Sequence, residues 1–206
     1  MGRETRPART LTELTFAEAA LEDQRRALAM SPGDRVQLVA ALLAVCLSTR
    51  GLRELPRLRR VIRILNRHRV RFVVIGGYAV AFHGLPRATD DVDVLIDREP
   101  SNVLRAEKAL LEFAGTAPRK QALRQRGGVV RIGGPVTHID VTTKVDGIGA
   151  FGPVWARRVP GDFLGERTSY ISAPDLLRTT RAANRPKDQG DIAFLVELLA
   201  KRPRGS

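Results

Sequence analysis

Two aspartates alternate with valines in the segment Asp91-Val92-Asp93-Val94. Side chains alternate between the two faces of a β-strand, so the pattern predicts the valines in a core and both carboxylates on the opposite face. Two carboxylates this close repel each other, and burying them without a partner is costly. A divalent cation removes the conflict, because hard cations prefer carboxylate oxygens, and phosphoryl-transfer sites commonly hold two such ions about 4 Å apart.

A third carboxylate for such a site is Asp140, in the segment His138-Ile139-Asp140-Val141. It also alternates with apolar neighbours on a predicted strand, where His138 would share its face. Adjacent strands lie about 4.8 Å apart, so the three acids converge if this strand lies beside that of Asp91. Asp140 is then the candidate for helping to deprotonate an attacking hydroxyl. The alternative is that Asp90 and Asp91 form a turn and Asp93 is exposed on a half-buried strand.

A glycine pair, Gly76-Gly77, follows the β-branched and aromatic segment 71–75. Without Cβ atoms, backbone N–H groups can approach an anion such as a phosphate closely. Taken alone, the pair is also compatible with an ordinary turn from a strand to a helix.

Together these features resemble the nucleotidyltransferase superfamily of the DNA polymerase beta type. The resemblance covers about residues 61–199, and within the superfamily it is strongest to the AbiEii-like toxins of toxin–antitoxin pairs. The motifs that carry it are Gly76-Gly77, Arg87-Ala88-Thr89-Asp90-Asp91-Val92-Asp93, Ile139-Asp140-Val141, and Arg185-Pro186-Lys187-Asp188 with Asp191.

The resemblance implies an enzyme that moves a nucleoside monophosphate from a nucleoside triphosphate to an acceptor hydroxyl. The implied catalytic residues, which would also bind two Mg²⁺ ions, are Asp91, Asp93 and Asp140. The implied nucleotide-binding residues are Gly76, Gly77, Arg87, Thr89, Arg185 and Lys187. The implied acceptor is an RNA such as tRNA, or a protein, and the implied protein partner is a cognate antitoxin.

Two features keep alternatives open. Arg185 and Lys187 are equally suited to ordinary ion pairs with Asp188 or Asp191. Relatives often carry a lysine in the preceding helix, where Thr180 stands in this chain. The second hypothesis is therefore a catalytically degenerate module with the same fold, which binds RNA or a protein partner.

Composition narrows the classes of partner and compartment. The 206 residues carry a net charge of +13, which favours polyanionic partners, although solubility alone explains it equally well. The longest largely apolar run, 36–47, is shorter than the roughly 20 residues of a membrane span, so no membrane association is expected. The single cysteine, Cys46, excludes an internal disulfide, and we expect a cytoplasmic protein.

Hydrophobic periodicity and capping signals predict alternating helices and strands. Predicted helices span about residues 11–30, 56–69, 78–83 and 186–201, and three others begin at caps, namely Asp34, Ser101 and Ser172. The helix from Asp34 is expected to stop at Gly51, and that at 56–69 to have Pro56 in its first turn. Predicted strands span 71–75, 91–96, 129–132 and 136–141, whereas 147–165 is expected to be mostly connection.

These elements predict an α/β (α+β) fold, with a nucleotidyltransferase-type mixed β-sheet flanked by helices. We expect residues 1–55 to form an N-terminal helical extension, and residues 56–206 to form the nucleotidyltransferase domain with its C-terminal helices. One side of the helix at 56–69 carries Arg60, Arg63 and Arg67. This side is either a solvated helix face or a docking surface for RNA phosphates or an acidic partner.

Overall fold

The computed structural model describes residues 25–46, 48–87, 89, 91–115, 122–125, 127–133 and 138–201, and only the backbone within 42–46 and 48–54. The helix predicted over 11–30 lies largely outside this part, although residues 25–29 are helical. None of the described helices combines the length and the apolar composition that crossing a bilayer requires.

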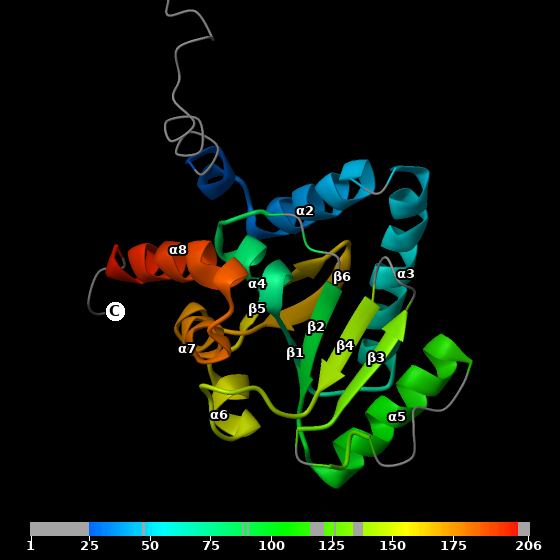
Figure 1. Cartoon of the computed structure of the whole chain (residues 1–206). Coiled ribbons are helices and arrows are strands. Elements are labelled where there is room, and N and C mark those ends of the chain that lie inside the picture. The colour runs from blue at the N-terminus through cyan, green and yellow to red at the C-terminus, as the bar shows by residue number, and fades with distance from the viewer. Residues whose placement is uncertain are drawn as a thin grey trace, which may run out of the picture.

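A six-stranded mixed sheet forms the centre of the molecule, in the order β3-β4-β2-β1-β6-β5 (Figure 1). Its strands are β1 (Phe72–Ile75), β2 (Asp91–Ile96), β3 (Val129–Gly133), β4 (His138–Thr142), β5 (Val159–Phe163) and β6 (Glu166–Tyr170). The pairs β2–β4 and β1–β6 are parallel, and the other three pairs are antiparallel. The mixed sheet with flanking helices confirms the predicted fold class.

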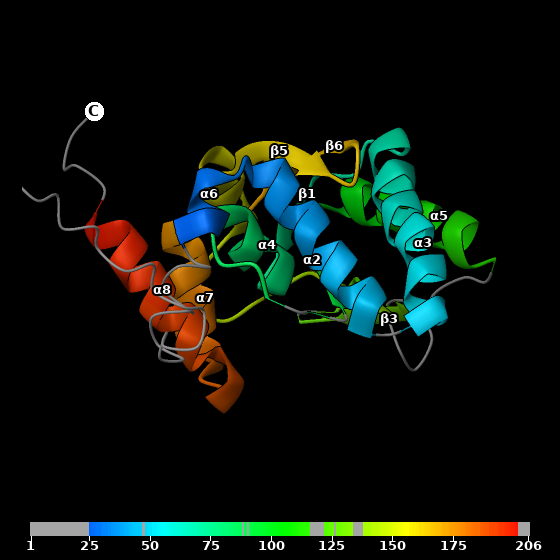
Figure 2. The ribbon, with the colours of Figure 1, turned by 90° about the horizontal axis from the view of Figure 1, so that it is seen from above.

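Helices flank this sheet in two groups (Figure 2). Their bounds are α2 (Pro32–Cys46), α3 (Ser48–Arg67), α4 (Gly76–His83), α5 (Pro100–Ala114), α6 (Phe151–Ala156), α7 (Ala173–Ala183) and α8 (Gln189–Ala200). Helices α3 and α5 pack together on one side, where the apolar stripe of α3, from Leu58 to Leu65, is buried. Helix α4 packs against α2 and α7, and α7 packs against α8.

The segment 147–165 differs most from its prediction as a connection. It contains α6 and β5, and the two-residue turn Leu164-Gly165 joins β5 to β6. Both turn residues have positive φ, at 53° and 85°, as a type I′ hairpin turn requires. Leucine rarely occupies the first position of such a turn. Pro160 is compatible with β5 because β5 is an edge strand of the sheet.

Three helix starts also differ from their predictions. Ser31, and not Asp34, caps α2, because the Ser31 hydroxyl accepts a hydrogen bond from the Asp34 amide. Glu99, and not Ser101, caps α5, because its carboxylate accepts from the amides of Ser101 and Asn102. Gly51 and Pro56 do not limit α3, which begins at Ser48 and packs against α2, so tertiary packing outweighs local propensity. The predicted Ser172 cap on α7 is present.

Arg35 joins the N-terminal helices to the rest of the fold. This buried guanidinium donates hydrogen bonds to the backbone carbonyls of Ala27 and Phe82, each at 2.8 Å, and of Met30 at 2.9 Å. Burial lowers the pKa of Arg35. These carbonyl dipoles hold the guanidinium and fix α2 against the C-terminal end of α4.

Candidate active site

The parallel strands β2 and β4 bring the three aspartates onto one face of the sheet. Asp93 is the register partner of Asp140, and Asp91 is the partner of His138. Because partners on adjacent strands lie about 4.8 Å apart and point the same way, Asp93 and Asp140 are neighbours. The intervening apolar side chains point to the opposite face and are buried, namely Val92, Val94, Ile139 and Val141.

Asp93 lies in the middle of this group and is partly buried. Burial, together with the negative charges of Asp140 and Asp91, raises the pKa of Asp93 to about 6. Arg185 and His138 act in the opposite direction. Within the described part of the chain, no side chain donates a hydrogen bond to Asp93. This face of the sheet therefore holds a carboxylate whose negative charge is poorly compensated.

The other two aspartates each have a basic partner. His138 places its Nδ1 atom 2.8 Å from Oδ1 of Asp91 and its Nε2 atom 3.8 Å from Oδ2 of Asp140. Arg131, on the edge strand β3, donates from Nε and Nη2 to the two oxygens of Asp140, at 2.8 and 2.7 Å. Arg131 was not among the predicted site residues, because its position opposite Asp140 depends on the register of the β3–β4 pair.

The donor types at this face fit a divalent cation, since carboxylate oxygens are the ligands that Mg²⁺ prefers. A metal centre also requires that the acidic side chains converge on one point. Among the described residues, no three His, Cys, Asp or Glu side chains are grouped as a metal centre. In this structure Asp91 lies against His138, and Asp140 is paired with Arg131.

The glycine pair lies directly against these acids. Gly76 is the first residue of α4 and has a φ of +65°, so there is no separate turn between β1 and α4. A Cβ atom on Gly76 would lie 2.1 Å from Oδ2 of Asp93, and one on Gly77 would lie 2.7 Å from Oγ1 of Thr89. The N-cap residue of α4, Ile75, makes no side-chain hydrogen bond to the first amides of this helix, and a helix N-terminus attracts anions.

The cations predicted to bind phosphate have acidic partners in this structure. Arg87 binds Asp191 through two nitrogens, at 2.8 and 2.7 Å, and Arg185 donates to Asp188 at 2.6 Å. Arg185 therefore makes the ion pair that was its alternative role, although its charge still acts on Asp93. Lys187 is exposed.

Thr180 does not supply the positive charge that a lysine would. It is buried, and its hydroxyl donates to the carbonyl of Leu176 at 2.8 Å. The neighbouring Arg178 donates to Asp175 at 2.9 Å. At this position, therefore, neither Thr180 nor Arg178 offers the uncompensated positive charge that a nucleotide-binding lysine would supply.

The arginines on the outer side of α3 are also engaged. Arg63 forms an ion pair with Glu166 at 2.8 Å, Arg67 forms one with Glu112, and Arg60 lies over the ring of Phe113. These contacts favour a solvated helix face over a docking surface, because part of the positive charge is compensated locally.

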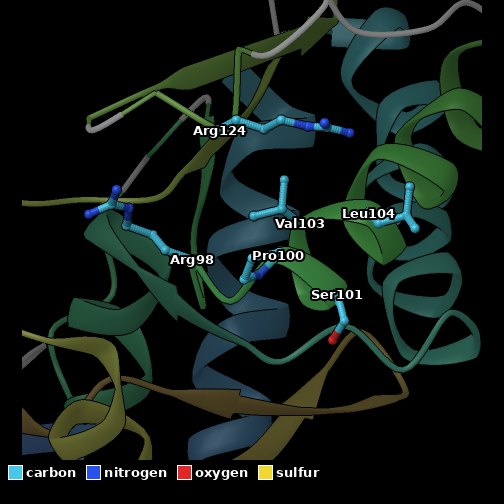
Figure 3. A pocket seen from close by; sticks show the side chains of 6 residues that line it. All are labelled: Arg98, Pro100, Ser101, Val103, Leu104 and Arg124. Carbon is cyan, nitrogen blue, oxygen red and sulfur yellow. The ribbon is translucent and has the colours of Figure 1, made fainter.

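A pocket of about 450 Å³ lies away from the acids, at the start of α5 (Figure 3). Its lining consists of Arg98, Pro100, Ser101, Val103, Leu104 and Arg124. Arg98 follows the C-terminal end of β2, whereas Asp91 begins that strand, roughly 16 Å away at 3.3 Å per residue. The first amides of α5 are already bound by Glu99, so this pocket is not an anion site of the helix terminus.

Comparison with known proteins finds distant similarity in structure alone. The solution structure of the antibiotic-resistance factor ANT(2'')-Ia matches with a TM-score of 0.49 and 12% identity, over 71% of this chain and 82% of that chain. The crystal structure of an antigenic nucleotidyltransferase-like protein from Paracoccidioides brasiliensis matches with a TM-score of 0.43 and 16% identity, over 79% and 75%. No protein-family model and no curated protein matches the sequence.

Proposed function

We propose that this chain is a cytoplasmic nucleotidyltransferase that depends on a divalent cation. One observation carries the proposal: Asp93 and Asp140 are register partners on adjacent parallel strands, beside Asp91 on the same face. Partial burial, together with the neighbouring carboxylates, raises the pKa of Asp93 to about 6. Carboxylates with raised pKa values cluster at functional sites, where a bound ligand compensates their negative charge.

In the proposed reaction, an acceptor hydroxyl attacks the α-phosphorus of a nucleoside triphosphate and pyrophosphate leaves. Asp91, Asp93 and Asp140 would hold the cation, whose chemistry when bound is to neutralise charge on the phosphoryl oxygens. Asp140 would accept the proton of the hydroxyl, and the first amides of α4, at Gly76 and Gly77, would bind the phosphates.

Several finer assignments belong to the same proposal. Mg²⁺, as two ions, is the cation suggested by the donor set. Arg87, Thr89, Arg185 and Lys187 would contribute to the nucleotide site, with the two arginines exchanging part of their present ion pairs for phosphate. An RNA such as tRNA, or a protein, would be the acceptor, and the chain would act as the toxin of a toxin–antitoxin pair.

The test is incubation with Mg²⁺, labelled triphosphates and bulk tRNA or total protein. Asp93→Asn and Asp140→Asn should lower labelling about 100-fold or more, because both change groups that act on the reacting phosphate. Asp146→Asn is the matched control, since this exposed carboxylate pairs only with Lys144, outside the site. Equal labelling by the wild type and Asp93→Asn would contradict the proposal.

A second candidate is a non-catalytic module of the same fold that binds RNA or a protein partner. Thr180 favours it, because its hydroxyl is bonded to the helix backbone and gives no charge to a triphosphate. Calorimetry with a triphosphate distinguishes the two functions. Binding that requires Mg²⁺ supports the enzyme, and the absence of such binding supports the module.

A further inference from the structure

Arg131 lies on the acidic face, and the proposed reaction gives it no role. It lies on β3, an edge strand of the sheet, directly opposite Asp140 in the antiparallel register. Its guanidinium forms a two-pronged pair with both carboxylate oxygens, at 2.8 and 2.7 Å. Arg131 is mostly exposed, with 64% of its side-chain surface accessible, whereas Asp140 has 16%.

This pair uses both oxygens of Asp140, and a divalent cation would need at least one of them. A guanidinium matches a carboxylate in shape and carries the same sign of charge as a metal ion. Arg131 therefore fills the requirement for positive charge at one of the three acids. It also holds Asp140 from the β3 side of this face, and no grouped metal centre is present among the described residues.

We propose that Arg131 is a positioning residue that holds Asp140 in the cation-free protein and competes with the divalent cation for it. The inference rests on the proposed function, because it assumes that Asp140 is a cation ligand. The exposure of Arg131 makes the exchange feasible, since the guanidinium can move into water while the backbone bonds between β3 and β4 stay intact. If Asp140 took no part in cation binding, the same cross-strand pair would contribute to the stability of the hairpin, and removing it would leave cation affinity unchanged.

Calorimetric titration with Mn²⁺ and with Mg²⁺, each without nucleotide, tests the competition. Arg131→Gln should bind the cation about 3- to 10-fold more tightly than the wild type, because the competing exposed ion pair is gone. Arg131→Lys should fall between the two, since an ammonium cannot make the two-pronged contact. Arg124→Gln is the matched control, because Arg124 makes a similar exposed pair with Glu107 outside the site, and it should bind like the wild type.

Circular dichroism checks that each variant is folded. If Arg131→Gln does not fold, the comparison of Arg131→Lys with the wild type still tests the inference. Cation affinity in the Arg131 variants that is equal to or weaker than that of the wild type would overturn the inference. If the wild type binds Mn²⁺ and transfers label in an Asp93-dependent way, that failure leaves the proposed function intact. If no protein binds either cation and no label is transferred, the inference and the proposed function both fail.

Discussion

The sheet and the C-terminal helices bury carboxylates in opposite ways. In the helices, each buried carboxylate receives hydrogen bonds from an arginine: Asp175 from Arg157, Asp188 from Arg185, and Asp191 from Arg87. In the sheet, Asp93 has Asp140 and Asp91 as its charged neighbours, and no side chain in the described residues donates a hydrogen bond to it.

The pKa values follow this difference. Burial alone would raise the pKa of Asp175, but the hydrogen bonds from Arg157 and Ser172 lower it below its usual value. For Asp93, burial and the neighbouring acids act together and raise the pKa to about 6. A buried acid that the fold has paired is part of the structure, whereas one that the fold leaves uncompensated is a candidate for binding a ligand.

Replacing one acid of each kind should therefore change stability in opposite directions. Asp175→Asn should lower the free energy of unfolding by about 2 kcal/mol, because the buried carboxylate loses its charge-assisted hydrogen bonds from Arg157 and Ser172. Asp93→Asn should raise the free energy of unfolding by about 1 to 3 kcal/mol in metal-free buffer at pH 7, because the substitution removes a poorly compensated negative charge. Urea denaturation followed by circular dichroism measures both, and destabilisation of equal size in the two variants would remove the distinction.

The pH dependence of stability should separate the two regions next. Without divalent cations, Asp93 titrates near pH 6 in the folded protein and near 3.8 in the unfolded chain. Between those values the folded protein binds more protons, so stability should fall as pH rises, by up to about 3 kcal/mol. Asp175, with its lowered pKa, should act in the opposite sense, so its stabilisation should be lost only as pH falls below about 4.

The measurement is a series of urea denaturations from pH 4 to 7.5 in the presence of a chelator. The wild type should lose stability across pH 4 to 6, and Asp93→Asn should not. Parallel curves for the two proteins would mean that Asp93 is not the group responsible.

A smaller effect is expected where the backbone meets the acid. Gly76→Ala should lose about 1 to 2 kcal/mol of stability, because alanine is strained at a φ of +65°. The added Cβ should also displace the Asp93 carboxylate and lower transfer activity by about 10-fold. Gly149→Ala is the control, since its Cβ would enter open space. Unchanged activity in Gly76→Ala would show that the position of the Asp93 carboxylate is not critical.

The sequence predicted the elements and acids that repeat regularly. The alternation of acidic and apolar side chains identified β2 and β4. The partners of the acids could not be predicted in the same way. Arg87 and Asp191 are 104 residues apart, and Arg131 meets Asp140 only through the register of a hairpin, so neither pair leaves a local pattern.

The hydrogen bonds of Arg35 have a consequence for how the N-terminal region can communicate with the sheet. Arg35 is on α2 and holds the last turn of α4 through the carbonyl of Phe82. The other end of α4 begins at Gly76, whose backbone contacts Asp93. A protein that binds α2 and displaces it would therefore also displace α4, which is only eight residues long. The opposite end of α4 lies against the Asp93 carboxylate, so this displacement would reach the acidic face.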